Sequence, residues 1–237
     1  SNLLSALYKL PSLKDKRLRL LLGSILDKER IEMAGHKVDI IFHTAAVKNI
    51  EISEFNPIET VDVNTNGTIN MIKMSMKNKP KKFLNISTDK AANASTLYGS
   101  TKQLSEKLIS WAGETIPETK FATSRFGNII ESRGNVFEVW EDELSKNKPL
   151  SITHPSMERY FFHVDEAVEF IFESLILMDK GEIFVPKMKS FTIKELANKL
   201  SKKQKITGLR KGEKMEEILL TDEEKEVALE KKNMWII

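Results

Sequence analysis

Four short apolar runs, each ending in small or polar residues, place the strongest constraint on how this chain folds. The clearest is the largely apolar run Val38–His43, which ends at Thr44-Ala45-Ala46. A strand that is apolar along its length is typical of a parallel sheet covered on both faces. The other three runs cover residues 18–22, 83–86 and 121–126. The sequence therefore predicts four buried strands with small or polar residues at their carboxyl ends.

Segments with helical periodicity alternate with these runs. Apolar residues recur at three- and four-residue spacing over Pro57–Met76 and Leu97–Trp111, and two later helices are expected at Val164–Met178 and Ile193–Leu200. This order favours an α/β fold, a parallel sheet with helices on both faces. Ligands of such sheets bind just outside the carboxyl ends of the strands. The strand ends therefore predict one shared crevice.

Composition excludes several other classes of protein. The 237 residues suit one large domain or a domain and a half, and a net charge of +3 without aromatic residues in the basic clusters gives no reason to expect a nucleic-acid partner. With no cysteine and four scattered histidines, we expect no metal site. No apolar run approaches the length of a membrane span, about 18 residues, and none resembles a signal peptide. We expect a cytoplasmic location and no membrane span in this segment.

A tyrosine and a lysine four residues apart, Tyr98 and Lys102, give the first indication of chemistry. Residues at this spacing lie on the same side of a helix. A free phenol, with a pKa of about 10, is a poor base near neutrality, and a nearby ammonium lowers that pKa. The pair can then take a proton from a sugar hydroxyl while a nicotinamide accepts hydride from the same carbon. The spacing alone favours an ordinary pair of surface residues, because it occurs by chance in many helices.

An acid and an amine, Asp89 and Lys90, follow the strand expected at residues 83–86. A second acid and base suit a reaction that also breaks a C–H and a C–O bond. Lys90 acts as a base only if it spends time neutral, which requires desolvation or cationic neighbours such as Lys102. Asp89 must conversely hold a proton, so the two side chains would titrate as a coupled pair. The alternative is a plain ion pair at a strand end.

The glycine-rich turn that holds a dinucleotide is missing from the chain. None of the ten glycines has the Gly-x-Gly-x-x-Gly spacing. We expect that a first strand, helix and second strand, roughly 40 to 50 residues in such folds, are absent from this chain. Residues 1–130 would then form a partial NAD(P)-binding Rossmann domain. Residues 131–237 would be mainly substrate-binding, with some segments returning to the Rossmann core. The competing interpretation is a domain that never bound a dinucleotide.

From about Leu18 to Ile237, the chain resembles the extended short-chain dehydrogenase/reductases that act on nucleotide sugars. The greatest similarity is to the inverting UDP-N-acetylglucosamine 4,6-dehydratases of glycan biosynthesis. Each motif is modest alone, and their order carries the resemblance. The motifs lie at residues 42–48, 64–68, 87–91, 98–102, 125–129, 132–134, 159–161, 181–185 and 208–214.

The resemblance implies roles for the matching positions. Tyr98 would deprotonate the sugar 4-hydroxyl, with Thr88 near the same hydroxyl and Lys102 on the nicotinamide ribose. Lys90 would remove the C5 proton and return it on the opposite face, while Asp89 helps water leave from C6. The product would be a UDP-6-deoxy-4-keto sugar with C5 inverted. The resemblance also implies NADP as the cofactor (with NAD possible), a UDP-sugar substrate and a homo-oligomer.

Further binding residues are implied in the same way. Ser24 and Asn93-Ala94-Ser95 depart from the family pattern, which usually has an aspartate at the first position and Asn-Pro before the tyrosine. The first departure bears on cofactor preference and the second on the loop before Tyr98. Besides Tyr98 and Lys102, the expected cofactor-binding residues are Ser24, Ile25, Thr44, Ala45, Ser87 and Ile129. The expected substrate-binding residues are Lys48, Asn128, Arg159, Arg210 and Glu213.

Two other functions stay open. A nucleotide-sugar 4-epimerase or a retaining 4,6-dehydratase shares oxidation at C4 and differs in the later steps. The pair Asp89 and Lys90 favours elimination, because simple epimerisation needs no second acid and base. A function of another class is a non-catalytic sugar-binding module built on a truncated Rossmann fold.

Overall fold

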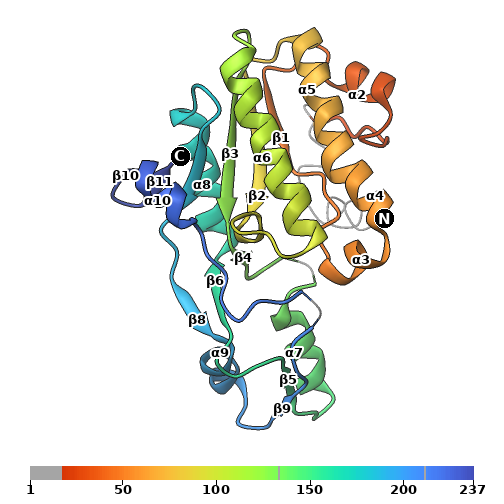
Figure 1. Ribbon diagram of the computed structural model, residues 1–237. Helices are drawn as coiled ribbons and strands as arrows, with labels where there is room; N and C mark the ends of the chain where they lie inside the picture. The colour runs from red at the N-terminus through yellow and green to blue at the C-terminus, as the bar shows by residue number, and fades with distance from the viewer. Residues whose placement is uncertain (1–17, 133, 211) are drawn as a thin grey trace.

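A six-stranded sheet organises the larger part of the molecule (Figure 1). The computed structural model describes residues 18–132, 134–210 and 212–237. The sheet has the order β1-β2-β3-β7-β11-β10, in which the first four strands are parallel and the last two are antiparallel to their neighbours. These strands are β1 (Ile40–His43), β2 (Lys82–Thr88), β3 (Lys120–Phe126), β7 (Ile183–Pro186), β11 (Met234–Ile236) and β10 (Leu229–Glu230).

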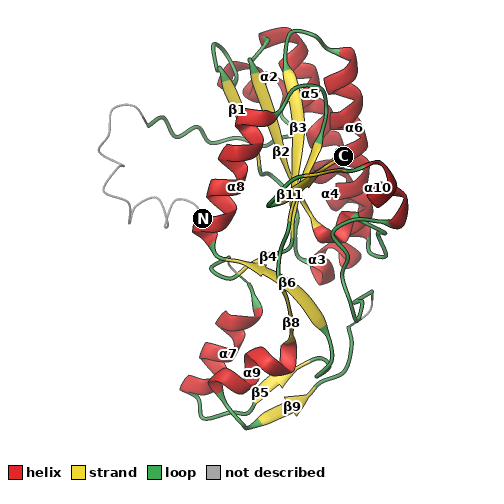
Figure 2. Ribbon diagram, turned by 90° about the vertical axis from the view of Figure 1, so that its left-hand side faces the viewer, coloured by secondary structure: helices red, strands yellow, loops and turns green. Residues whose placement is uncertain are grey.

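Helices cover both faces of this sheet. Helices α5 (Gly67–Asn78) and α6 (Leu97–Thr115) lie on one face and α8 (Val164–Leu177) lies on the other (Figure 2). The predicted α/β fold with a parallel sheet between two helical layers is therefore confirmed. The other helices of the described residues are α2 (Lys28–Ala34), α3 (Ile50–Phe55), α4 (Pro57–Val61), α7 (Val136–Ser145), α9 (Ile193–Leu200) and α10 (Asp222–Val227).

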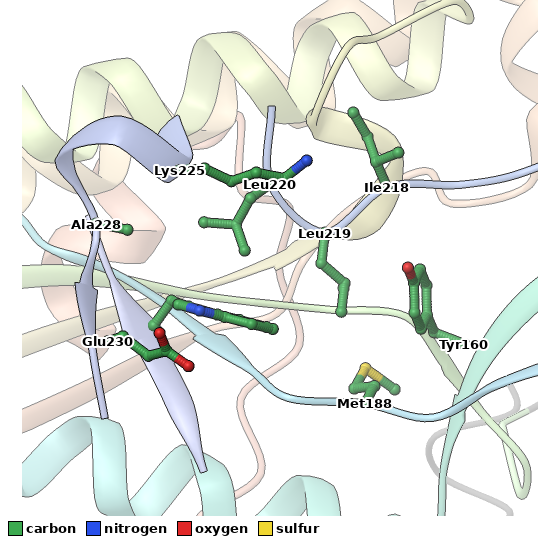
Figure 3. A pocket seen from close by; sticks show the side chains of 9 residues that line it. Tyr160, Met188, Ile218, Leu219, Leu220, Lys225, Ala228 and Glu230 are labelled. Carbon is green, nitrogen blue, oxygen red and sulfur yellow. The ribbon is translucent and has the colours of Figure 1, made fainter. Parts of the chain in front are cut away.

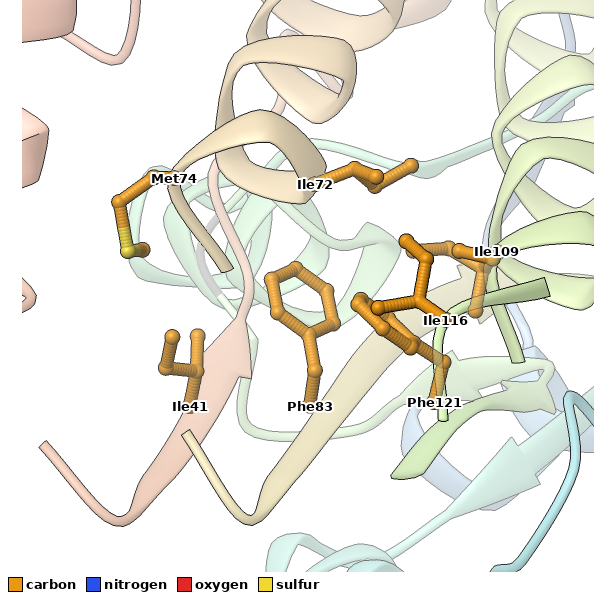
Figure 4. Packing of buried hydrophobic residues seen from close by; sticks show 8 residues of the cluster. Ile41, Ile72, Met74, Phe83, Ile109, Ile116 and Phe121 are labelled. Carbon is orange, nitrogen blue, oxygen red and sulfur yellow. The ribbon is translucent and has the colours of Figure 1, made fainter. Parts of the chain in front are cut away.

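The strands contribute apolar side chains to a core on each face. Phe83 of β2 and Phe121 of β3 have ring centroids 5.3 Å apart and pack under α5 and α6 (Figure 4). The next residue of β2, Leu84, belongs to the core beneath α8. Successive residues of a strand point to opposite faces, so burial on both sides accounts for the apolar runs in the sequence.

One predicted strand is wrong. The run Leu18–Leu22 is irregular and exposed, with Leu22 86% exposed. A strand needs a hydrogen-bonded neighbour, and this run pairs with none of the described strands. Apolar composition alone does not supply that partner.

The helix expected over Pro57–Met76 contains a π-helical turn. Residues Asp62–Asn66, between α4 and α5, have this wider geometry, which accommodates one extra residue in a helix. Within the turn, the Asn64 amide nitrogen donates to Thr101 Oγ1 at 3.0 Å and to the Val47 carbonyl at 3.1 Å. Asn64 Oδ1 accepts from the Val47 amide at 2.7 Å. The turn therefore connects the loop after β1 to α6.

A smaller lobe lies beyond the carboxyl ends of the main strands (Figure 1). Its core contains Trp140, whose indole nitrogen donates to the Ser151 carbonyl at 2.8 Å. The segment after residue 130 supplies this lobe and also α8, β7, β10 and β11 of the larger part. The lobe contains α7, α9 and the strands β4 (Asn128–Ile129), β5 (Leu150–Ile152), β6 (Glu158–Phe162), β8 (Ser190–Thr192) and β9 (Gln204–Ile206).

Candidate active site

The end of β2 and the beginning of α6 bring the predicted reactive residues together. A single 3-10 turn, Asp89–Ala91, follows β2, and its first residues are capped by the Thr88 side chain. The Thr96 hydroxyl accepts from the Gly99 amide at 3.1 Å and caps α6. A Cβ on Gly99 would lie 2.4 Å from the Lys90 carbonyl oxygen. The first turn of α6 therefore packs against the 3-10 turn only because position 99 has no side chain.

Asp89 and Lys90 form a close ion pair. Lys90 Nζ lies 2.9 Å from Asp89 Oδ1, and the Thr88 hydroxyl donates to the same oxygen at 2.9 Å. The Asp89 side chain is fully buried. Its other oxygen, Oδ2, has no hydrogen-bond partner among the described residues. A buried oxygen of this kind is suited to bind a polar group of a ligand.

Burial raises the pKa of the Tyr98 phenol above its ordinary value, since the Lys90 ammonium and a hydrogen bond with Thr88 oppose burial without reversing it. The expected lowering of this pKa by Lys102 is therefore wrong for the folded chain. Desolvation disfavours the charged phenolate more than the neighbouring cation stabilises it. The cation that acts on Tyr98 is Lys90, not the lysine four residues along the helix.

Lys102 is anchored to the strand instead. Its Nζ donates to the Ile86 carbonyl oxygen at 2.5 Å. Burial lowers the pKa of Lys102 to about 8, against the opposing attraction of Glu106. The side chain therefore links α6 to β2 below the reactive cluster. Its contact with a nicotinamide ribose stays a prediction.

Lys90 is not neutral in this structure, although a base must spend time as a neutral amine. Burial acts to lower its pKa, but the carboxylates of Asp89 and Glu217 together raise that pKa above the ordinary value. The expectation that desolvation or a cationic neighbour favours the neutral amine is therefore not met in this state of the protein. Two carboxylates hold Lys90 as an ammonium.

The second of these carboxylates was missed by the sequence analysis. Glu217 Oε1 lies 3.9 Å from Lys90 Nζ, and the Glu217 side chain is only 5% exposed. Burial raises the pKa of Glu217 as well. Its position just after the polar loop at residues 208–214 is the only signal in the sequence, and that signal names no partner.

The residues expected to bind the cofactor lie at or near strand ends. Thr44 and Ala45 are exposed just after β1, and Ile129 lies in β4. Ser87 is buried near the end of β2, and its hydroxyl has no hydrogen-bond partner in the described part of the chain. Ser24 is exposed and Ile25 lies against Gly67. The placement of Thr44, Ala45 and Ser87 fits a ligand across the β1 and β2 ends.

The residues expected to bind the substrate are less closely grouped. The Asn128 amide donates to the Tyr160 carbonyl at 3.1 Å. Arg159 is buried, and its guanidinium donates to three backbone carbonyls, those of residues 158, 214 and 215. Lys48 is exposed on the loop after β1. Their contacts with a nucleotide sugar stay predictions.

Arg210 and Glu213 belong to a loop that covers the segment before Tyr98. Glu213 Oε2 accepts from the Arg210 amide at 3.0 Å, and Arg210 Nε lies 3.6 Å from a carboxylate oxygen of Glu51 in α3. The Gly212 carbonyl accepts from Ser95 Oγ at 3.3 Å. This loop and α3 therefore meet beside the reactive cluster.

A pocket of about 450 Å³ lies beside the C-terminal residues 218–235 (Figure 3). Its lining includes Tyr160, Met188, Lys225 and Trp235, and none of the five predicted catalytic residues lines it. Among the described residues, no group of three or more His, Cys, Asp or Glu side chains is placed to hold a metal ion. Within the same residues, no helix combines the length and apolarity that crossing a membrane requires.

Curated relatives align with nearly the whole length of this chain. An "uncharacterized membrane protein" of Methanocaldococcus jannaschii is 38% identical, with 93% of this chain and 71% of the relative covered. An inverting UDP-N-acetylglucosamine 4,6-dehydratase of Campylobacter jejuni is 36% identical, with 93% and 67% covered. A UDP-glucose 4-epimerase of Rickettsia conorii is 34% identical, with 90% and 65% covered.

A solved structure supports the same grouping. The structure of Pen from Bacillus thuringiensis superposes with a TM-score of 0.93 at 32% identity, covering 100% of this chain and 78% of that one. The family model described as polysaccharide biosynthesis protein matches residues 4–237. The resemblance drawn from the motifs is thus confirmed. The chain belongs to the polysaccharide biosynthesis protein family, within the extended short-chain dehydrogenase/reductases of nucleotide-sugar metabolism.

Proposed function

We propose that the protein, as a hydro-lyase, removes water from UDP-N-acetylglucosamine across C5 and C6 and inverts C5, giving a UDP-6-deoxy-4-keto sugar for surface glycan biosynthesis. The observation that carries the proposal is the buried pair Asp89 and Lys90 beside Tyr98. Oxidation at C4 alone needs one proton acceptor. The cluster offers an acid and an amine in addition, and both are held out of bulk water.

Each residue of the cluster has a proton to move. Tyr98, as a phenolate stabilised by the Lys90 ammonium, takes the proton of the 4-hydroxyl. A proton first passes from the Lys90 ammonium to the Asp89 carboxylate within their ion pair, which leaves a neutral amine and a carboxylic acid. With a keto group at C4, the C5 proton becomes acidic and passes to that amine. Asp89 gives a proton to the C6 hydroxyl, which leaves as water. Lys90 then returns a proton to C5 on the other face of the ring.

The arrangement at the strand ends fits a nicotinamide dinucleotide, NADP or NAD. Such a cofactor would supply the chemistry of accepting hydride from C4 and giving it back at C6. The unpartnered Ser87 hydroxyl offers a hydrogen bond there, Thr44 and Ala45 offer backbone at the end of β1, and Lys102 lies beneath.

An exposed apolar surface beside β1 is an argument for a further structural unit that packs there. Strand β1 is at the edge of the sheet, and its Ile40 and Phe42 are 41% and 42% exposed. Phe42 stacks edge-on against Phe172 of α8, which is 53% exposed. We propose that a strand-helix-strand unit with the phosphate-binding glycines covers this surface in the working enzyme.

A nucleotide-sugar 4-epimerase is the second candidate function, favoured by the relative of that name. An epimerase needs Tyr98 and a cofactor but no acid for C6. A retaining 4,6-dehydratase needs the acid but leaves C5 uninverted, and a sugar-binding module needs none of these steps. The products of the reaction distinguish all four functions.

The test uses the protein expressed from the start codon of its gene, supplied with NADP and UDP-N-acetylglucosamine in deuterated water. NMR should show a C6 methyl group, deuterium at C5 and inverted C5 stereochemistry. An unchanged C6 hydroxymethyl group would contradict the proposal. Lys90→Ala should abolish deuterium incorporation at C5, whereas Lys73→Ala, on the exposed side of α5, should leave it intact.

A further inference from the structure

We propose that Glu217 is a positioning residue for Lys90: its carboxylate, fixed beside the amine, keeps Lys90 protonated and loses that hold when Glu217 itself takes up a proton. The inference rests on the proposed function for its consequence in catalysis. It makes Glu217 the group that sets how often the base of the C5 step is available.

The geometry places Glu217 between two amines. Its Oε1 lies 3.9 Å from Lys90 Nζ, and its Oε2 lies 3.9 Å from Lys214 Nζ. Oε2 has no hydrogen-bond partner among the described residues, although the side chain is buried. A buried carboxylate with an oxygen that accepts no hydrogen bond is costly in its charged form. It therefore takes up a proton more readily than an exposed glutamate.

Two buried arginines hold the segment that carries Glu217. On one side, Arg159 donates to the carbonyl oxygens of Lys214 and Met215, at 2.9 and 3.2 Å. On the other, Arg125 donates to the Leu219 carbonyl at 3.0 Å.

Arg125 is itself fixed by the paired hydrogen bonds that it donates to the carboxylates of Glu106 and Glu224. The two arginines therefore fix the backbone around Glu217, so its side chain is held in place and does not move freely on the surface.

The charges around Glu217 allow its protonation to change the pKa of Lys90. Lys90, Asp89, Arg159 and Lys214 act on it electrostatically. Lys90 in turn faces Asp89, Glu217 and Tyr98. When Glu217 is ionised, Lys90 has two anionic neighbours and stays an ammonium. When Glu217 is protonated, one of them is lost and the neutral amine becomes more accessible.

Chemical labelling tests this without any enzymatic activity. Acetylation of Lys90 by acetic anhydride, followed by mass spectrometry over a range of pH, reports the midpoint at which its amine becomes neutral. In Glu217→Gln the midpoint should move to lower pH. At a pH below both midpoints, a midpoint that is lower by one pH unit makes labelling about tenfold faster. Glu217→Met is a second neutral replacement of similar length.

The matched control is Glu216→Gln, which removes the same charge from the exposed neighbouring residue. Its Lys90 midpoint should match the unmodified protein. If the midpoint is the same in Glu217→Gln, Glu217→Met and Glu216→Gln, the positioning role is overturned.

A second readout separates this role from the proposed function. The pH profile of C5 deuterium exchange should shift to lower pH in Glu217→Gln with the same plateau. Slower exchange at every pH would overturn the proposal, because Glu217 would then act as a proton acceptor. If the labelling midpoint shifts while even the unmodified protein shows no exchange, the proposed function fails and the positioning role stands.

Discussion

The Lys102 ammonium nitrogen lies 2.5 Å from the Ile86 carbonyl oxygen, and this contact ties helix α6 to strand β2. Tyr98 stands one turn before Lys102 on the same helix, and Thr88 ends the same strand. The contact therefore fixes the two sides of the reactive cluster relative to each other. It also buries a lysine whose charge is expensive to keep.

Replacing Lys102 by methionine should change how stability depends on alkaline pH. The pKa of Lys102 is about 8 in the folded protein, against 10.5 for a solvated lysine. The unfolded chain therefore binds more protons between these values, so stability rises as pH increases across them. In Lys102→Met, this rise in the free energy of unfolding should be smaller by up to about 3 kcal/mol. Urea unfolding at several pH values checks it, and Lys107→Met, on the exposed side of α6, should keep the original slope.

His43→Gln should make the protein less sensitive to acid. Burial, aided by Lys102, lowers the pKa of His43 to about 3 from 6.5. Stability that is present above pH 6.5 is therefore lost as pH falls toward 3, because the unfolded chain takes up the proton first. By pH 4, the glutamine variant should avoid about 3 kcal/mol of that loss. Denaturation midpoints between pH 7 and pH 4 measure it, and the exposed His36→Gln should behave like the original protein.

Arg125→Met should destabilise the fold by about 3 to 5 kcal/mol, because it leaves the buried Glu106 carboxylate without its partner. Urea denaturation gives the magnitude. Hydrogen exchange should quicken over residues 215–220, since the bond to the Leu219 carbonyl is lost. Glu224→Gln removes a partner that is 21% exposed and should cost less. Equal losses in the two variants would contradict this account.

Asp89→Asn should separate the two halves of the proposed reaction. C4 oxidation depends on Tyr98, so reduced nicotinamide should still form, as followed by its absorbance. Loss of water from C6 should slow by about 10²- to 10⁴-fold, the usual effect of removing a general acid. Asp165→Asn, on the exposed side of α8, should change neither step. If Asp89→Asn stops oxidation as well, Asp89 acts before the elimination.

The fold was predictable wherever strands are buried on both faces. Phe83 and Leu84 are fully buried on opposite sides of β2, so the run has no polar alternation and is visible in the sequence. Leu18–Leu22 is also largely apolar and is not a strand. Pairing depends on a neighbour in space, which a short apolar run does not reveal.

The sequence predicted that Asp89, Lys90 and Tyr98 lie together, but it predicted neither Glu217 beside them nor the electrostatics of the cluster. Helical spacing placed Tyr98 and Lys102 on one side of α6, and the strand end brought Asp89 and Lys90 beside Tyr98. The sign of the Tyr98 pKa shift depends on burial, which spacing does not show. Glu217 reaches Lys90 only because two arginines direct a distant segment across it.

The π-helical turn at Asp62–Asn66 absorbs one residue more than an α-helix over the same span. Deleting one residue there would restore ordinary helical winding and leave the flanking helices α4 and α5 close to their present orientation, but it would remove the wide turn that presents Asn64. Asn64 would then swing away from Thr101 and Val47. A mutation that neither adds a charge nor touches a reacting group would thus break the connection between the two segments flanking the site.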